Sequence, residues 1–504
     1  MSIVQKPLEV LRRPGEFTSD NTRVIARFFQ PGNEVRILDM VQRVQDLSDD
    51  TIAFLLKKVK KEYADRHRDF EKILMHHFDK LIRHFGQQIG RHIIPDIEAL
   101  SSERQLLIGA YFTLEYSVEA AALFNPSIVP HPIQESIPDG STRFIMSFRA
   151  TGEGHISSIV FRSGIIGPDC EISFDPISGY IETAEFLKDS VYDKRLFGLK
   201  LLEMNVSNKV SSQIFDHLPD EFTFDQLEDA TSEVEKKRLF QAVYQSEMFE
   251  TMRWLARSNY ELKFRHDRRI SERVIFPVSE NEIEGIEDAR FVRFTDDDGS
   301  VTYYATYTAY NGMQILPQLI STKDFIRFRI ITLNGKAVQD KGMALFPRKV
   351  NGKYVMISRQ DGINLHIMYS EHLHFWQESN ILRRPKFPWE FTQIGNCGSP
   401  LETEAGWLLL THGVGPMRKY CIGVDLLDLN NPSEVIASLD KPILAPNEYE
   451  REGYVPNVVY TCGYMIHKDQ LIIPYAMSDA KCAIASISVP ELLELLLSKA
   501  DASN

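Results

Sequence analysis

From about residue 124 onward, the sequence is a succession of short runs of β-branched and aromatic residues separated by Gly, Asn, Asp and Pro. The runs have the length of single strands, and the residues between them favour tight turns. Clear examples are Arg143 to Phe148, Ile156 to Arg162, Tyr354 to Ser358, Gly406 to Thr411 and Gln470 to Pro474. Many short strands at fairly even spacing indicate a mainly β sandwich, barrel or propeller. No exact internal repeat is visible, so the spacing alone does not select among these architectures.

The first hundred residues differ, because their apolar residues recur at helical spacing. Ser48 offers an N-cap oxygen before a helical pattern over Thr51 to Gly86, and a second helix is predicted over Ser101 to Leu123. We therefore predict a mostly helical N-terminal extension over residues 1–120, without a catalytic group. A helical insertion is predicted over residues 222–262. The predicted β-rich catalytic domain spans residues 121–490, and a short helix and tail occupy residues 491–504.

Composition narrows the classes of protein. The chain has 504 residues, 43% of them hydrophobic, which is ample for a large core. Its net charge of -13 and the lack of a basic stripe argue against binding to nucleic acid. The five cysteines are widely spaced without a CxxC, so neither a disulfide framework nor a zinc site is expected. No apolar run can span a bilayer, and Met1 to Arg13 lacks a signal-peptide core. We expect a cytoplasmic protein with reduced thiols, no membrane contact and no metal.

The candidate for acid chemistry lies in the stretch Gly285 to Arg290. It places two carboxylates and a guanidinium at the start of the strand-like run Phe291 to Phe294. A carboxylic acid at the inner end of a strand, with a cation nearby, can hand a proton to a leaving group. Asp288 is therefore a candidate general acid; the alternative is that it only caps a turn.

Several separated motifs resemble glycoside hydrolase family 130, which comprises mannoside phosphorylases and mannosidases. They are the Glu-Asp-Ala-Arg stretch with Tyr304 to Tyr310, Asn125 to Ser127, Ser147 to Ala150, Lys341 to Lys349, Gly406 to Leu408 with His412 to Val414, Asp425 to Leu429, Pro442 to Leu444, Val455 to Val459 and Tyr475 to Asp479. The resemblance covers roughly residues 120–490 and implies a five-bladed β-propeller. Similarity over the N-terminal helices indicates the longer-chain branch, which includes phosphorylases of β-1,2-linked mannooligosaccharides.

The resemblance also implies roles for individual residues. Asp288 matches the acid, which in this family is thought to act through a substrate hydroxyl. Lys341 and His412 match the anion site of the phosphorylases. Further candidates for phosphate are Arg149, Arg348 and Arg418, with Arg359 in the same region. Candidates for the mannoside are Asn125, Ser127 and Asp479 by family position, His155 in a polar loop, and Tyr307 as a stacking surface.

Inverting cleavage needs an acid and a nucleophile on opposite faces of the sugar. A phosphate nucleophile needs a cationic cradle but no base, whereas water needs a second carboxylate. The leading hypothesis is a phosphorylase that releases mannose 1-phosphate from β-mannosides, with β-1,2-mannooligosaccharides as expected substrates. Inorganic phosphate is then a co-substrate, and no cofactor is expected. The alternatives are a β-mannosidase with Glu153, Glu287 or Glu402 as base, and a non-catalytic carbohydrate-binding propeller.

Two departures from the family pattern keep the hydrolase alternative open. Gly342 stands where the family has an Asp after the Lys, and Asn311 to Gln314 stands where an arginine often follows. Arg149, Arg327 and Arg329 are possible replacements for that arginine. An acidic chain with helical appendages is also compatible with self-association into a homo-oligomer.

Overall fold

The computed structural model describes residues 8–94, 99–187, 191–203, 209–236, 242–279, 282–310 and 315–501. The chain forms two compact units, which we call the β unit and the N-terminal helical unit. The β unit consists of residues 1–19, 121–177 and 184–504, and the N-terminal helical unit of residues 20–120 and 178–183. In the described ranges, no helix combines the length and the apolar character needed to cross a membrane.

The N-terminal helical unit contains four helices in its described part: α1 (Glu34–Gln45), α2 (Asp49–Tyr63), α3 (Phe70–His92) and α4 (Ser102–Tyr111). The side chains of Asn33, Ser48 and Ser101 cap α1, α2 and α4 by accepting from backbone N–H groups. The core is made by apolar side chains such as Ile37, Leu81 and Ile108. The N-terminal prediction of helix is therefore correct for this unit, although the helical pattern is broken between α2 and α3, where Asp69 has a φ of 54°.

Three strands in the first 120 residues were not predicted. β2 (Val24–Phe28) pairs with β3 (Thr113–Ser117), so the helix predicted over residues 101–123 ends at Tyr111. β1 (Leu11–Phe17) pairs with the strand Lys481–Ser488 and belongs to the β unit. Its sequence holds both Pro14 and Gly15, which weaken a strand pattern. The described part of the extension predicted over residues 1–120 therefore contains these strands besides its helices, and its first residues belong to the β unit.

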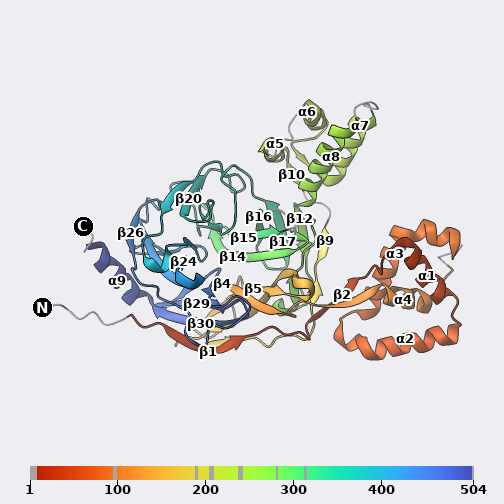
Figure 1. The fold of residues 1–504 in the computed structure, drawn as a ribbon, viewed down its shortest axis with the longest axis horizontal. Helices are drawn as coiled ribbons and strands as arrows, with labels where there is room; N and C mark the ends of the chain where they lie inside the picture. The colour runs from red at the N-terminus through yellow and green to blue at the C-terminus, as the bar shows by residue number, and fades with distance from the viewer. Residues whose placement is uncertain are drawn as a thin grey trace. The chain divides into compact units, whose positions relative to one another are not determined.

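The β unit is built from successive antiparallel groups, which confirms the mainly β prediction. The first group is β4 (Ala122–Pro130), β5 (Thr142–Thr151), β6 (Ser157–Ile166) and β7 (Ile172–Phe174). The second group is β14 (Gly285–Thr295), β15 (Val301–Tyr310), β16 (Ile315–Thr322) and β17 (Arg327–Thr332) (Figure 1). They share one sheet, because β6 meets β14 at Ser157 and Gly285. Outside them, β12 (Tyr260–Lys263) pairs with β17 and with β9 (Glu185–Leu187), and β13 (Arg273–Ile275) pairs with β6.

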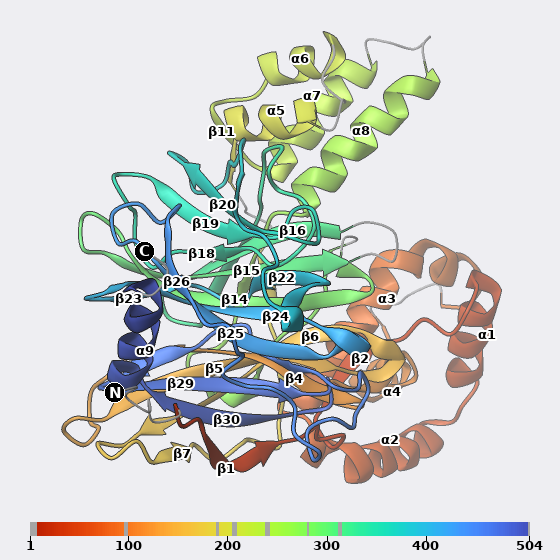
Figure 2. The ribbon, with the colours of Figure 1, turned by 60° about the vertical axis from the view of Figure 1, so that its left-hand side comes forward.

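Three further groups complete the described part of this unit. The third group is β18 (Ala344–Leu345), β19 (Tyr354–Ser358), β20 (Leu365–Ser370) and β21 (Asn380–Arg383). The fourth is β22 (Gln393–Asn396), β23 (Leu401–Thr403), β24 (Gly406–Val414), β25 (Tyr420–Leu427) and β26 (Val435–Ser438). The fifth is β27 (Val459–Tyr460), β28 (Met465–His467), β29 (Gln470–Met477) and β30 (Lys481–Ser488) (Figure 2). Every strand predicted from residue 143 onward coincides with one of the strands of this unit, and only the prediction over Ile156 to Arg162 extends beyond its strand, by one residue at the start of β6.

Between the first two groups the chain forms a helical insertion. It contains α5 (Lys194–Glu203), α6 (Lys209–Asp216), α7 (Phe224–Lys236) and α8 (Ala242–Arg257), with β10 (Tyr192–Asp193) paired to β11 (Glu221–Phe222). It has its own apolar core, which includes Phe197, Leu227 and Met252. The insertion predicted over residues 222–262 therefore begins too late and ends too late, since residues 260–263 form β12. Gly198 lowers the helix propensity of α5, which is one reason why the sequence pattern missed it.

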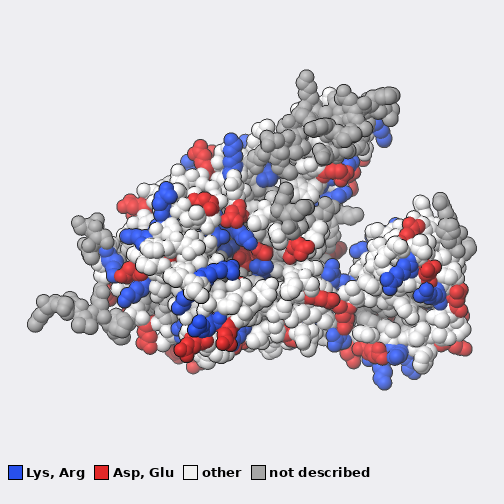
Figure 3. Space-filling view, viewed as in Figure 1, with Lys and Arg blue, Asp and Glu red and all other residues white. Residues whose placement is uncertain are grey.

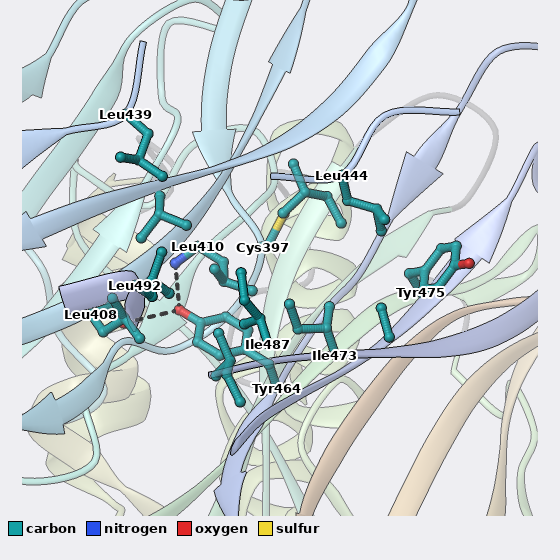
Figure 4. Packing of buried hydrophobic residues seen from close by; sticks show 14 of the residues in the cluster. Cys397, Leu408, Leu410, Leu439, Leu444, Tyr464, Ile473, Tyr475, Ile487 and Leu492 are labelled. Carbon is teal, nitrogen blue, oxygen red and sulfur yellow. Dashed lines mark hydrogen bonds between the residues drawn. The ribbon is translucent and has the colours of Figure 1, made fainter. Parts of the chain in front are cut away.

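The C-terminal helix α9 (Val489–Asp501) has Pro490 in its first turn and packs into the largest apolar cluster of the β unit. Leu492 of α9 joins Leu408, Leu410 and other buried side chains in that cluster (Figure 4). The Tyr464 hydroxyl donates to Leu408 O at 3.4 Å and accepts from Leu410 N at 2.8 Å. The surface is chemically mixed, with acidic and basic side chains interspersed over the face seen in Figure 3.

Candidate functional site

Asp288 lies at a bulge in β14. The register between β14 and β15 shifts between Glu287 and Arg290, and Asp288 has a φ of 55°. A bulge inserts an extra residue, bends the strand and re-aims a side chain, and positive φ is uncommon for any residue except glycine. The Asp288 side chain remains 15% exposed. The strand therefore presents this carboxylate in a special local conformation instead of in the regular alternation of a β-sheet.

The neighbouring strand β4 uses the same device. Its register with β5 shifts between Phe124 and Ser127, and Asn125 has a φ of 48°. Asn125 Nδ2 donates to Asp288 Oδ1 at 2.6 Å. Ser127 Oγ accepts from Phe291 N at 3.0 Å, which fastens β4 to β14 behind the two bulges. The structure therefore brings Asn125 to Asp288, whereas the Ser127 hydroxyl serves the backbone of β14.

Two cations and a second carboxylate surround Asp288. Arg149 Nη2 donates to Glu287 Oε1 at 2.8 Å, and Arg149 Nη1 lies 3.5 Å from Asp288 Oδ1. Lys341 Nζ donates to the other Glu287 oxygen at 3.1 Å. Ser157 Oγ accepts from Arg149 Nε at 3.0 Å and fixes the guanidinium. Glu287 thus bridges two of the cations that the sequence nominated for phosphate, Arg149 and Lys341.

The buried Arg290 side chain contacts the backbone of Asp288. Its Nη1 donates to Asp288 O at 3.0 Å, and its Nη2 donates to the Tyr460 hydroxyl at 2.6 Å. Burial would raise the pKa of Asp288, but Arg149, Arg290, the Asn125 hydrogen bond and Lys341 outweigh it and hold that pKa below its ordinary value. Asp288 is therefore a carboxylate at neutral pH in the unliganded protein.

His412 is a neutral imidazole. It is buried on β24, and burial, reinforced by Arg359, lowers its pKa to about 3. Its Nδ1 lies 3.0 Å from Asn396 O and must carry the proton, because a carbonyl oxygen can only accept. Nε2 therefore offers a lone pair, and Arg359 Nη1 lies 3.5 Å from it. At the predicted anion site, His412 can therefore contribute a hydrogen bond but no positive charge in this state of the protein.

Close packing fixes this imidazole and the segment around Lys341. A Cβ atom at Gly395 would lie 2.4 Å from His412 Cε1, so only glycine fits beside the ring. Asn396 Nδ2 donates to Gly342 O, which ties the lysine segment to the strand next to His412. Gly342 has a φ of 81°, a conformation that glycine adopts at little cost. The departure from the family pattern at this position thus has a backbone explanation.

Asp479 follows β29 and completes the acidic side of the site. It has a φ of 52°. Burial, together with the negative charges of Asp288 and Glu287, raises its pKa to about 6, whereas Arg149 and Arg418 act in the opposite direction. These mutual effects place Asp479 in the same electrostatic neighbourhood as Asp288. Arg418 itself is exposed, with a φ of 54°, and its guanidinium lies 6.0 Å from the centre of the Tyr420 ring.

Other nominated residues make their contacts elsewhere. Tyr307 is buried and donates its hydroxyl to Glu282 Oε1 at 2.6 Å, so its ring packs in the core. Arg348 forms a two-pronged ion pair with Glu402, at 2.6 and 2.7 Å, over the Trp407 ring. His155 is exposed and stacks on Tyr454, with ring centres 6.1 Å apart.

The potential replacements for the family arginine also differ in position. Arg149 is in the site, whereas Arg329 donates to Val191 O at 2.9 Å and Arg327 is exposed on β17. The segment Asn311 to Gln314 lies outside the described residues.

Sequence analysis noted Arg290 only as a cation near Asp288 and assigned no role to Tyr460 or Asn396. Arg290 belongs to the motif around Asp288, but its partner Tyr460 is 170 positions away along the chain. The motif noted at Val455 to Val459 stops one residue short of that tyrosine. No local pattern signals such a contact, because it forms only when the two strands meet in the fold.

Comparison with known proteins gives a consistent result. The model of glycoside hydrolase family 130, described as beta-1,4-mannooligosaccharide phosphorylase, matches residues 240–498. The 1,2-beta-oligomannan phosphorylase of Thermoanaerobacter sp. (strain X514) is 32% identical over 231 residues, which cover 44% of this chain and 75% of that protein. A beta-1,2-mannobiose phosphorylase of Listeria innocua serovar 6a is 31% identical over 229 residues, covering 44% of this chain and 63% of that protein.

A second beta-1,2-mannobiose phosphorylase, also from Thermoanaerobacter sp. (strain X514), is 36% identical over 234 residues, 43% of this chain and 72% of that protein. The solved Listeria innocua beta-1,2-mannobiose phosphorylase in complex with beta-1,2-mannobiose is 22% identical, with a TM-score of 0.44 over 76% of this chain and 93% of the other. The family match includes Asp288, Lys341, His412 and Asp479, and it begins after Asn125 and Arg149.

Proposed function

This chain belongs to glycoside hydrolase family 130, and we propose that it cleaves β-mannosides by phosphorolysis with inversion, releasing mannose 1-phosphate. β-1,2-linked mannooligosaccharides are the proposed substrates, in keeping with the names of the relatives. Inorganic phosphate is the co-substrate, and the reaction needs no further cofactor. The observation that carries the proposal is the gathering of Arg149 and Lys341 beside the Asp288 carboxylate.

We also propose that the antiparallel groups of the β unit are the blades of a five-bladed propeller. The first strand of each group, or the segment leading into it, supplies one residue to the site: Asn125 from β4, Asp288 from β14, Lys341 before β18, Asn396 from β22 and Tyr460 from β27. Such a pattern is expected when the first strands of all blades surround a central channel. The same geometry accounts for the spread of the site residues along the chain.

In the proposed reaction, a phosphate oxygen attacks the anomeric carbon as the bond from that carbon to the glycosidic oxygen breaks. The departing oxygen takes a proton that originates from Asp288 and passes through a mannose hydroxyl. Asp288 must first be protonated, yet Arg149, Arg290 and Lys341 favour its ionised form. The negative charge of a phosphate bound to Arg149 and Lys341 counteracts their effect on Asp288 and raises its pKa. Bound phosphate therefore favours protonation of Asp288 and also acts as the nucleophile.

Glu287 competes with phosphate for the two cations Arg149 and Lys341. Glu287 accepts from both Arg149 and Lys341, so an incoming phosphate exchanges places with this carboxylate. The lone pair of His412 Nε2 faces Arg359 Nη1 at the long distance of 3.5 Å, so a substrate hydroxyl or the P–OH of a monoanionic phosphate can replace that donor. Arg359, next to His412, supplies a further positive charge. The nucleophile site thus combines charge with one acceptor.

Hydrolysis is the second candidate, since Glu287 is a carboxylate inside the site. The two other proposed bases fit less well, because Glu402 is paired with Arg348 and Glu153 lies in an exposed loop. As a water-activating base, Glu287 would have to abandon its two cations or work beside them. Phosphorolysis needs no such base, and we therefore prefer it.

The deciding experiment is incubation with β-1,2-mannobiose and mannotriose, with and without inorganic phosphate, followed by analysis of the products. We expect mannose 1-phosphate, formed only when phosphate is present, and synthesis of longer mannosides when mannose 1-phosphate and an acceptor are supplied. β-1,4-Mannobiose serves as the matched control for linkage. Free mannose released at an equal rate without phosphate would establish hydrolysis instead.

A further inference from the structure

Two aromatic side chains form an exposed stack at one end of the β unit. His155 lies in the turn between β5 and β6, and Tyr454 lies in the segment before β27. Their ring centres are 6.1 Å apart, and the ring planes are inclined by 27°. His155 is exposed, and Tyr454 is 71% exposed, so most of the tyrosine surface is accessible to a ligand. We call this pair the aromatic platform.

The turn that carries His155 lies beside the residues that hold Arg149. β5 and β6 are joined at the end of the sheet where β14 begins, because Ser157 meets Gly285 there. Ser157 Oγ also accepts from Arg149 Nε at 3.0 Å. His155 N donates to Gly152 O at 3.2 Å, which closes the turn two residues before Ser157. His155 therefore stands next to the residue that fixes one of the proposed phosphate ligands.

The segment that carries Tyr454 packs against the turn that carries Asp479. Val455 N donates to Ser478 O at 3.0 Å. On the other side of Tyr454, a Cβ atom at Gly453 would lie 2.4 Å from Ser478 O, so only glycine fits at this contact. Both neighbours of Tyr454 thus contact Ser478, the residue before Asp479. The tyrosine is therefore held beside the acidic side of the site.

The two halves of the platform belong to the rim of one site. Arg149 lies 3.5 Å from Asp288. Asp288 raises the pKa of Asp479 and Arg149 lowers it, so the three side chains are neighbours. The turn of His155 and the segment of Tyr454 approach this group from two sides and meet in the stack. Asp288 is mostly buried, whereas the platform is exposed, which places the platform at the outer edge of the site.

A β-mannoside unit combines an apolar face, made by its axial C–H groups, with hydroxyl groups around its edge. An accessible aromatic ring can cover such a face, and polar side chains nearby can bind the hydroxyls. Arg418, which is exposed and acts on Asp479, is such a side chain. The platform therefore offers an apolar surface and a polar edge at the same place.

We propose that the aromatic platform binds one mannose unit of the departing part of the oligosaccharide, beyond the bond that is cleaved. The unit that is transferred lies against Asp288 and Asn125, which are mostly buried, so the units that follow it extend outward over the rim. The identity of the sugar rests on the proposed function. The platform adds the residue that determines affinity for the rest of the chain, Tyr454.

The test compares Tyr454→Ala with a matched control, Tyr449→Ala, in the full chain. Tyr449 lies in the same segment and is 62% exposed, but its ring centre lies 3.9 Å from Lys481 Nζ. Initial rates are measured with β-1,2-mannobiose, mannotriose and mannotetraose at saturating phosphate, and then with phosphate varied. Both variants should fold, because each removes a side chain that is mostly exposed.

Tyr454→Ala should raise the KM for the longer oligosaccharides by about tenfold, which is roughly the worth of covering one face of an aromatic ring. Binding of the departing part is the same before and during cleavage, so kcat and the KM for phosphate should stay within about twofold of the wild type. Tyr449→Ala should change none of these values. An effect on mannobiose as well would assign the platform to the unit next to the cleaved bond, and an effect on mannotriose and longer chains alone to the following unit.

Two further variants test the platform itself. Tyr454→Phe retains the ring and should keep the KM of the wild type. His155→Asn removes the imidazole with a residue that tolerates the φ of 63°, and it should raise the KM by about two- to fivefold because the tyrosine ring loses its support. Equal KM values for all oligosaccharides in Tyr454→Ala and the wild type would overturn the proposal. A changed sedimentation coefficient without a changed KM would also overturn it, because the ring would then belong to a contact with a second copy of this chain.

Binding to the inactive protein separates this inference from the proposed function. Titration calorimetry with mannotriose compares Asp288→Asn alone with Asp288→Asn combined with Tyr454→Ala. We expect about tenfold weaker binding by the double variant, whether the active protein uses phosphate or water. Unchanged affinity, together with phosphate-dependent cleavage by the wild type, would overturn the platform and leave the proposed function intact.

Discussion

Two buried clusters of charge in the β unit, one around Asp288 and one around Arg383, differ in how completely they are closed. Arg383 Nη1 and Nη2 donate to the two oxygens of Glu390 at 2.6 and 2.9 Å, and Nε donates to Asp425 Oδ2 at 2.8 Å. Around Asp288, by contrast, the Arg149 contact is 3.5 Å long, and Lys341 and Arg149 are shared with Glu287. The Arg383 guanidinium has hydrogen bonds to Glu390 and Asp425 and is fully paired with them. The cations near Asp288, by contrast, can exchange the Glu287 carboxylate for a ligand.

The direction of the pKa shifts expresses the same contrast. Burial raises the pKa of Asp425 despite the nearby Arg383, whereas the surrounding cations lower the pKa of Asp288 despite burial. The cations beside Asp288 are paired with Glu287, and an arriving anion can replace that carboxylate. Closed pairing therefore indicates a structural role, and open, exchangeable pairing indicates a binding site.

The largest expected effect is on catalysis by Asp288→Asn. The amide preserves the shape but supplies no proton, and general acid assistance is worth about a hundred- to ten-thousandfold. We expect mannoside cleavage to fall by that factor while the circular dichroism spectrum and melting temperature remain close to those of the wild type. Initial rates with β-1,2-mannobiose and phosphate provide the measurement. Near-wild-type turnover by the folded variant would remove Asp288 from the mechanism.

The second prediction concerns the closed cluster. Arg383→Met leaves Glu390 and Asp425 buried without their cation, and breaking such a pair typically costs about 3–5 kcal/mol of unfolding free energy. We expect a loss of that size in urea denaturation, with kcat of the protein that remains folded nearly unchanged. Arg348→Ala, which opens a half-exposed pair with Glu402, is the control and should cost less than about 1 kcal/mol. A selective loss of kcat in Arg383→Met would show that the closed cluster also serves the reaction.

Lys341 and Arg348 allow a matched test of the open cluster. Both are basic, and both side chains are 38% exposed, but only Lys341 lies beside Glu287 and Asp288. Lys341→Ala should raise the KM for phosphate by about 10- to 150-fold, the worth of one hydrogen bond to a charged group, with a smaller effect on oligosaccharide binding. Arg348→Ala should leave the KM for phosphate unchanged. Equal effects of the two substitutions would show that general surface charge, and not the site, determines phosphate affinity.

Local sequence patterns predicted the elements that depend on local residues. The strand over Tyr354 to Ser358 was predicted with its observed bounds. Asp288 was found because a second carboxylate, a guanidinium and a strand-like run lie next to it in the sequence. The strand β1 was missed because its stability comes from pairing with β30, more than 460 positions away. In the same way, α5 acquires its apolar environment from the packing of the whole insertion and not from a strong pattern of its own.

The candidate site was less predictable than the strands. The positive φ values of Asp288 and Asn125 occur without glycine. Asn and Asp adopt positive φ more readily than other residues with a side chain, but they are too frequent in this sequence to mark the two bulges. Sequence counted Tyr307 and Arg348 as site residues from their position in motifs, yet their partners, Glu282 and Glu402, engage them elsewhere. A motif identifies which strands approach the site. Which face of a strand each side chain occupies depends on the register, and a bulge changes that register.

The smallest expected effect is on the pH dependence of stability through Asp479. Its pKa is raised from 3.8 to about 6 in the folded protein, because it is buried near Asp288 and Glu287. Below about pH 3 the carboxyl is protonated in both states; between about pH 3 and 6 the unfolded chain releases the proton first, so this residue makes stability fall as pH rises. Above pH 6 the penalty is constant and corresponds to about 3 kcal/mol for a shift of this size. The amide in Asp479→Asn is itself a buried polar group and recovers only part of that penalty. The substitution should therefore raise the unfolding free energy at pH 7 by about 1–2 kcal/mol and have little effect at pH 3.5. Urea denaturation of both proteins at the two pH values gives the comparison. A substitution that destabilises the protein at pH 7 would mean that favourable contacts hold the Asp479 carboxylate, and the cluster around Asp288 would then be closed in the way that the Arg383 cluster is.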